Sequence, residues 1–237
     1  MSKTIIHRAD TRGHANHGWL DTHHTFSFSR YHNPERMNFG LLRVLNDDVV
    51  AGGMGFGAHP HDNMEIVSIP LSGSLAHQDS TGTKEVIRTN EVQIMSAGSG
   101  ITHSEFNGSQ TEPVNFLQIW VFPKERDIKP RYEQKAFNPE ERLNKLQTVV
   151  SPDKGSSAVW INQDAWFTLG SLQSGFAENY TLHKSGNGVY AFVLEGEVVI
   201  EGEALSKRDG MGISETDSIS IKASADAELL LIEVPMK

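Results

Sequence analysis

The amino-acid sequence predicts an all-β protein made of two β-barrels in tandem. Short apolar or alternating runs dominate it, separated by glycine, asparagine, aspartate and serine, as in residues 39–45, 67–71 and 115–121. Strand-length runs at regular spacing, bounded by turn residues, are typical of β-sandwiches and barrels. The chain has 237 residues, and two domains of roughly 100 to 130 residues can each bury a core of their own.

The two halves of the sequence repeat one pattern. Residues 69–75 and 192–198 each contain an apolar strand, a turn glycine and the start of a second strand. A longer apolar strand at 116–121 is matched by another at 229–234. Such echoes indicate a duplicated barrel, although two short matches can also arise by chance in an all-β chain.

A connector divides the halves. Residues 123–132 are charged, bounded by prolines and poor in apolar side chains, as linkers are. Residues 138–146 form the best helical stretch, because Asn138 can cap it and Pro139 suits a first helical turn. We predict an N-terminal barrel over residues 1–133 and a C-terminal barrel over 134–237.

Composition excludes several classes of function. The chain has no cysteine, so it has no disulfide, iron–sulfur cluster, thiol nucleophile or thiolate-bound metal. A net charge of −9 opposes attraction to nucleic acid and to anionic lipid. No apolar run approaches the roughly 20 residues of a membrane-spanning helix, and the first residues lack a secretory pattern. We therefore expect a soluble, cytoplasmic protein without a membrane or direct nucleic-acid partner.

The histidines are distributed unevenly, and this places the chemistry in the first half. Of the eleven histidines, only His183 lies in the second half. Two pairs stand out, His59 with His61 and His103 with Glu105. Residues i and i+2 of a strand point to the same face, so facing strands can present three imidazoles and one carboxylate to one ion. Such a set leaves one or two positions free on a six-coordinate metal.

The glycines and histidines in this half resemble the cupin motifs. The first motif is matched by Gly53-x5-His59-x-His61-x3-Glu65-x7-Gly73, and the second in part by Gly98-x-Gly100-x2-His103. Residues 12–21, 25–29, 58–61, 96–105 and 117–121 resemble the pirin branch in particular. The resemblance implies a bicupin of two jelly-roll barrels. Bacterial pirins of this type are known as quercetin 2,3-dioxygenases, which insert O₂ into a flavonol and release carbon monoxide.

The resemblance to pirins also implies a ligand set. It assigns His59, His61, His103 and Glu105 to one divalent transition metal, with iron(II) expected and nickel, manganese, cobalt, copper or zinc as alternatives. Many cupins instead take the carboxylate from the first motif, here Glu65. On a straight strand Glu65 would lie roughly 13 Å from His61, but the Asp-Asn dipeptide between them could turn it back. Glu105 is also the predicted catalytic base.

The second half lacks an equivalent set. Where the first histidine pair would recur, the chain reads Tyr180-Thr181-Leu182-His183, and no histidine follows residues 209–212. We predict a barrel without metal that has a structural role, with His183 on the surface or hydrogen-bonded.

Other candidate functional residues also have purely structural interpretations. Histidines 14, 17, 23 and 24 could form a second metal site, but their spacing suits loops and strand starts, the interpretation we favour. His77 and Asp79 could mimic a catalytic pair, and we interpret them as a strand end with a polar turn. An apolar pocket for a flat aromatic substrate could be lined by residues that also suit a plain core; these are Phe26, Phe28, Met54, Phe56, Met64 and Met95.

The leading functional hypothesis is a metal-dependent dioxygenase acting on a flavonol such as quercetin, with O₂ as the second substrate. A second hypothesis is a metal-bearing regulatory protein acting through a protein partner, because the similar eukaryotic pirins are associated with transcription cofactors. A third is another cupin reaction on an unidentified substrate.

Overall fold

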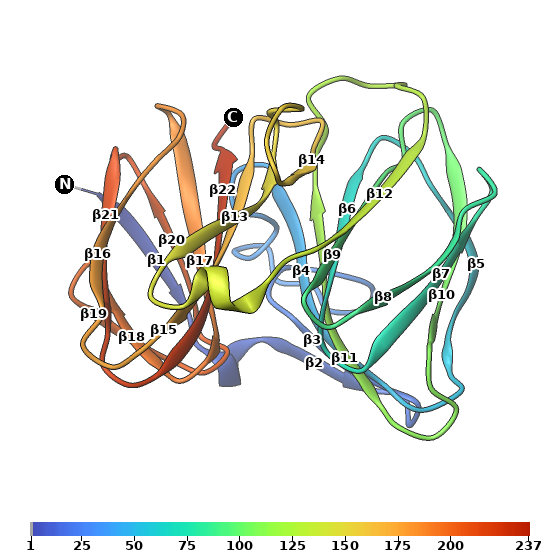
Figure 1. Ribbon diagram of the computed structural model, residues 1–237, viewed down its shortest axis with the longest axis horizontal. Helices are drawn as coiled ribbons and strands as arrows, with labels where there is room; N and C mark the ends of the chain where they lie inside the picture. The colour runs from blue at the N-terminus through green and yellow to red at the C-terminus, as the bar shows by residue number, and fades with distance from the viewer. Residues whose placement is uncertain (1) are drawn as a thin grey trace.

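A computed structural model describes residues 2–237, which form two β-barrels packed side by side (Figure 1). In the figure the first barrel, cyan to green, lies on the right and the second, orange to red, on the left. Each barrel combines a seven-stranded sheet with a four-stranded sheet. The predicted all-β tandem is confirmed. None of the helices within the described residues has the length and apolar character needed to cross a membrane.

The first barrel begins after a short 3₁₀ turn, η1 (Ala9–Thr11). Its larger sheet has the strand order β12-β9-β6-β11-β4-β3-β2, and its smaller sheet the order β5-β10-β7-β8. The strands are β2 (Gly13–Asn16), β3 (Leu20–His24), β4 (Leu42–Val50), β5 (Gly55–His61), β6 (Glu65–Ser72), β7 (Ser74–Asp79), β8 (Lys84–Arg88), β9 (Glu91–Ser96), β10 (Ile101–Asn107), β11 (Val114–Val121) and β12 (Arg131–Ala136).

The second barrel follows a 3₁₀ turn, η2 (Pro139–Arg142), which the Asn138 side chain caps by accepting from the Glu140 backbone N–H. Its sheets have the orders β1-β20-β17-β22-β15-β13-β14 and β16-β21-β18-β19. The strands are β1 (Lys3–His7), β13 (Leu146–Ser151), β14 (Val159–Trp160), β15 (Trp166–Leu172), β16 (Ala177–Thr181), β17 (Asn187–Glu195), β18 (Glu197–Ile200), β19 (Glu203–Ser206), β20 (Gly210–Ser214), β21 (Ser218–Ala223) and β22 (Ala227–Pro235).

The echo between the halves of the sequence corresponds to equivalent strands. In the first barrel β6 pairs with β11, and in the second β17 pairs with β22. The turn glycines Gly73 and Gly196 both have a positive φ, 75° and 76°. A side chain at Gly196 would also clash with the carbonyl oxygen of Asp226. Glycine is therefore required at this turn for both conformation and space.

Strand pairing differs from the predicted division of the chain in two places. The N-terminal strand β1 pairs with β20, so residues 3–7 belong to the second barrel's sheet. Strand β12 continues past residue 133 to Ala136 and stays paired with β9 of the first barrel. The division at residues 133 and 134 stays a prediction, and the helix expected over 138–146 is a single 3₁₀ turn.

An apolar core shared by both barrels holds them together. On β6 and β11 the side chains of Val67, Ile69 and Ile119 turn away from the first barrel's interior and join this core. From the second barrel Phe167 and Leu230 pack into the same cluster, and both are fully buried. Each central sheet therefore buries both faces, one inside its own barrel and one against its neighbour, and the buried apolar area stabilises the pair.

We expect the substitution Phe167→Ala to lower the free energy of unfolding by about 3–5 kcal/mol, because it leaves a cavity in the shared core. The matched control is Phe106→Ala, since Phe106 is 42% exposed and its loss should cost under about 1 kcal/mol. Urea denaturation of both variants checks this. Equal losses would contradict a stabilising core between the barrels.

Candidate metal centre

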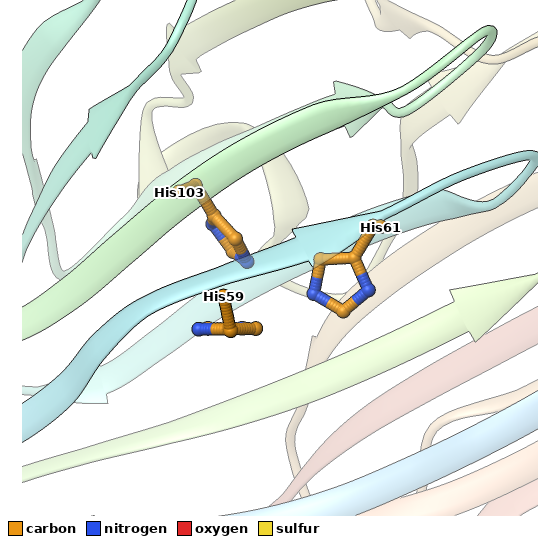
Figure 2. A group of neighbouring side chains, drawn as sticks. All are labelled: His59, His61 and His103. Carbon is orange, nitrogen blue, oxygen red and sulfur yellow. The ribbon is translucent and has the colours of Figure 1, made fainter.

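Three histidines meet where β5 and β10 pair at the edge of the first barrel. His59 lies opposite His103 in the antiparallel register, and His61 lies two residues further along β5. The ring centroids are 4.4 Å apart for His59 and His103 and 4.9 Å apart for the other two pairs. Figure 2 shows the three rings converging, and one nitrogen of each lies within 4.8 Å of the others.

Burial keeps two of these imidazoles neutral. His103 is buried, whereas His59 and His61 are partly exposed at the mouth. Burial, reinforced by neighbouring histidines, lowers the pKa of His61 to about 4 and that of His103 to about 2. Both rings are therefore unprotonated at neutral pH, the state in which imidazole binds a metal.

Glu105 lies fully inside the barrel, beside His103. One carboxyl oxygen accepts from Ser68 Oγ at 3.2 Å, and the other accepts from Gln118 Nε2 at 2.8 Å. Glu105 and His103 offer ligand atoms within 4.8 Å of each other, but within residues 2–237 the group containing His59 and His61 does not include Glu105. Burial, and then the nearby Asp48 carboxyl, raise the pKa of Glu105 to about 7.

Glu65, the alternative carboxylate, lies elsewhere. It is buried on the face of β6 opposite to Ser68, toward the second barrel. Its Oε2 accepts from Ser96 Oγ at 2.8 Å and from the backbone N–H of Asn162 at 3.1 Å. The turn at residues 62 and 63 therefore does not fold Glu65 back onto the histidines. The four-residue ligand set with Glu105 nonetheless stays a prediction.

A polar layer supports Glu105 from across the barrel. Gln118 of β11 lies opposite both Ser68 of β6 and Asn46 of β4, and Ser68 lies opposite Gln93 of β9. Residues opposite each other in neighbouring strands point to the same face, so these four side chains form one layer inside the barrel. Sequence reasoning missed this layer. Its signal was Gln118, a single amide in the middle of the apolar run 116–121.

His77 and Asp79, interpreted from sequence as the end of a strand, lie inside the site. Both side chains are fully buried, and His77 Nε2 is 3.0 Å from Asp79 Oδ2. In the register of β7 and β10, His77 lies opposite Glu105 and Asp79 opposite His103. His77 joins His103 and Glu105 in a second group of ligand atoms within 4.8 Å of one another. The predicted strand end with a polar turn is confirmed, since β7 ends at Asp79 and Thr81 donates to its carboxylate.

Aromatic rings form a wall beside the histidines. Trp120 packs edge-on against His61, with centroids 4.9 Å apart, and Phe28 packs against Trp120 at 5.3 Å. Trp120 was absent from the predicted pocket residues. Among those predicted, Met64 and Met95 lie in the same cluster as Trp120. The others lie elsewhere: Phe26 is in the core between the barrels, Phe56 packs on Trp19, and Met54 is 41% exposed.

The hairpin of β2 and β3 brings some of the N-terminal histidines together on the surface. His14 lies opposite His23 in the register, and their rings stack at 4.4 Å. His14 Nε2 is 2.8 Å from Asp21 Oδ1, and these three residues form an exposed donor group. Of the other two, His24 is buried and bonded to Asn46, and His17 lies outside the group.

Apolar residues occupy the equivalent positions in the second barrel. Superposing the registers of β6–β11 and β7–β10 on those of β17–β22 and β18–β21 pairs five polar residues of the site with apolar ones. All the second-barrel residues are buried in that barrel's core. Ser68, His77, His103, Glu105 and Gln118 correspond to Ala191, Ile200, Ile219, Ile221 and Leu231. The absence of a metal from the second barrel stays a prediction.

His183 has a structural environment. Its ring stacks on Trp166 at 4.9 Å, and its Nδ1 lies 3.0 Å from Glu233 Oε2. Glu233 also accepts from the Tyr180 hydroxyl and the Asn187 amide. Although burial raises it, these hydrogen bonds hold the pKa of Glu233 below its usual value. The Glu233 carboxylate therefore links strand β22 to Tyr180, His183 and Asn187 through hydrogen bonds.

Two family models match this chain, Pirin over residues 6–121 and Quercetinase C-terminal cupin domain over residues 148–234. A relative from Escherichia coli named Quercetin 2,3-dioxygenase is 44% identical in an alignment of 236 positions that covers 97% of this chain and 98% of that protein. The chain belongs to the pirin family. A Pirin-like protein of Caulobacter vibrioides is 40% identical, over 94% of this chain and 96% of its own length.

Solved pirin structures share the fold. The bacterial pirin YhhW of Escherichia coli, crystallised in complex with nickel(II), superposes with a TM-score of 0.93 at 43% identity. The match covers 98% of this chain and 99% of that protein. The predicted bicupin architecture of a pirin is thereby confirmed.

We expect Glu105→Gln to stabilise the metal-free protein progressively as pH rises. The folded-state pKa of Glu105 is raised to about 7, so the stability that its protonated form contributes is full below the unfolded pKa and is lost as pH rises through about 7. Glutamine has no such cost. The stability difference between variant and wild type should grow by roughly 3 kcal/mol from pH 4.5 to pH 8.

Urea denaturation of both proteins after chelator treatment, at several pH values, measures this difference. Glu201→Gln is the control, because Glu201 lies in a surface turn of the second barrel. A difference for Glu105→Gln that stays constant with pH would contradict burial of a protonatable carboxyl.

Proposed function

We propose that this pirin is a metal-dependent dioxygenase that cleaves a flavonol such as quercetin with O₂. The observation that carries the proposal is the convergence of His59, His61 and His103 beside the buried carboxyl of Glu105. Relatives named Quercetin 2,3-dioxygenase, 44% identical in the case of Escherichia coli, support the reaction type. Iron(II) is the proposed ion, and the nickel(II) complex of a similar pirin supports a divalent transition metal.

The residues fit such an ion. Neither ring nitrogen of His103 has a hydrogen-bond partner among the described residues, although both are buried. Buried polar atoms are normally paired, and a metal ligand would resolve this. Imidazole and carboxylate donors suit iron, nickel, manganese and cobalt. When bound, the metal would polarise the substrate hydroxyl and lower its pKa.

The protein's own groups would then position the substrate and move one proton. Trp120 and Phe28 offer flat apolar surfaces against which the flavonol rings can stack beside His61. Glu105, whose pKa is about 7, suits a general base at neutral pH and would accept the proton of the substrate hydroxyl. Ser68 and Gln118 hold its two oxygens and so fix the orientation of the carboxyl.

Partners and location remain part of the proposal. A small aromatic substrate and O₂ follow from the proposed reaction, whereas a protein partner and a cytoplasmic location stay predictions.

We expect metal-loaded wild-type protein to consume quercetin and release carbon monoxide in air, and to do neither without O₂. His59→Ala should lower the rate by more than the about 10- to 100-fold that loss of an outer-shell partner costs, because it removes one of three imidazole donors. His183→Ala, in the second barrel, is the control and should keep the wild-type rate. Spectrophotometry of quercetin and carbon monoxide analysis follow the reaction.

Two results would contradict the proposed dioxygenase function. One is the absence of quercetin loss with every divalent metal from manganese to zinc. The other is equal loss in the His59→Ala and wild-type proteins.

A further inference from the structure

His77 has the hydrogen bonding of a metal ligand rather than that of an ordinary core histidine. Its side chain is fully buried, and its Nε2 faces Asp79 Oδ2 at 3.0 Å. The other oxygen of Asp79 is held by the hydroxyl and backbone N–H of Thr81, at 2.6 and 2.8 Å. A carboxylate fixed in this way accepts from Nε2–H, which leaves the lone pair on Nδ1. Carboxylate–histidine pairs of this kind orient imidazoles toward metals.

That lone pair has no partner. His77 Nδ1 is buried and unpaired within the described part of the chain, as are both ring nitrogens of the adjacent His103. The His77 and His103 ring centroids are 5.3 Å apart. Three orphaned nitrogens on two touching buried rings are costly in a protein interior unless something binds them.

A third donor completes the arrangement. Glu105 lies opposite His77 in the register, and ligand atoms of His77, His103 and Glu105 all lie within 4.8 Å of one another. All three residues are buried, so a cation there would be shielded from water and balanced by the carboxylates of Glu105 and Asp79. We propose that His77, His103 and Glu105 form a second metal position, deeper in the barrel than the one at His59, His61 and His103.

The two positions share His103, so five side chains offer donors to an ion there: His59, His61, His77, His103 and Glu105. An ion entering between the partly exposed His59 and His61 can pass to the inner position by exchanging those two imidazoles for His77 and Glu105. This inference rests on the proposed metal centre but not on the dioxygenase reaction. The first barrel alone can do this, since the second barrel has Ile200, Ile219 and Ile221 at the corresponding places.

Crystals of the wild-type protein grown with excess Zn²⁺ test the inner position directly. Anomalous diffraction should show a zinc peak about 2.0–2.1 Å from a ring nitrogen of His77, the usual zinc–nitrogen distance. Zinc bound only at the outer position, with His77 outside bonding distance, would overturn the proposal.

Zinc affinity in solution gives a second test. A His23→Ala background removes the exposed His14–Asp21–His23 group, and His59→Ala with His61→Ala removes the outer position. We expect this triple variant to retain one Zn²⁺ per chain in competition with a chromophoric chelator. Adding His77→Ile should abolish that binding, and adding Asp79→Asn should weaken it about 10- to 100-fold.

Controls separate ligand loss from unfolding. Isoleucine suits position 77 because the second barrel has Ile200 there, and circular dichroism verifies the fold of each variant. Adding His24→Ala, at another buried histidine of the same barrel, should leave the zinc affinity unchanged. A triple variant that binds no zinc, or His77→Ile binding as tightly as its parent, would refute the inner position. The zinc measurements do not depend on quercetin turnover. Failure of the inner metal position can therefore be distinguished from failure of the proposed dioxygenase function.

Discussion

The burial of Glu105 at the centre of the first barrel is the constraint on which the site depends. A carboxyl group inside a barrel is costly unless its oxygens are paired. Ser68 and Gln118, each opposite the other in β6 and β11, provide that pairing. Because residues alternate between faces, placing these side chains inside the barrel also sends Val67 and Ile119 outward into the core shared with the second barrel. The register of β6 and β11 therefore determines both which side chains enter the site and which join the core between the barrels.

The second barrel shows the same scaffold without that constraint. Ala191, Ile221 and Leu231 take the places of Ser68, Glu105 and Gln118, so this barrel has no counterpart of the Glu105 carboxyl at that position. The apolar face of β17 and β22 packs against β6 and β11 in the core shared by the two barrels. The polar interior lowers the stability of the first barrel, and the apolar area buried against the second barrel offsets this loss.

Sequence predicted the local features of the site and not those that depend on pairing between distant strands. The two-residue period of a strand predicted that His59 and His61 share one face, and likewise His103 and Glu105. The turn glycines indicated that the barrel is duplicated. The roles of Trp120 and Gln118 could not be predicted from their own strand, because they depend on the pairing of β11 with β6 and β4. The strand end at His77 and Asp79 is confirmed, but its position beside His103 and Glu105 could not be predicted, because those neighbours come from β10. Similarly, the pairing of β1 with β20 joins residues some 200 apart in sequence and has no local signature.

The central claim is that imidazoles of the first barrel hold one divalent metal. X-ray absorption spectroscopy of the nickel(II)-loaded protein tests this most directly, because imidazole ligands produce a characteristic multiple-scattering pattern. We expect nitrogen and oxygen neighbours only, with scattering from at least two histidines that declines in His59→Ala. A spectrum without imidazole scattering, or one that is unchanged in that variant, would contradict it.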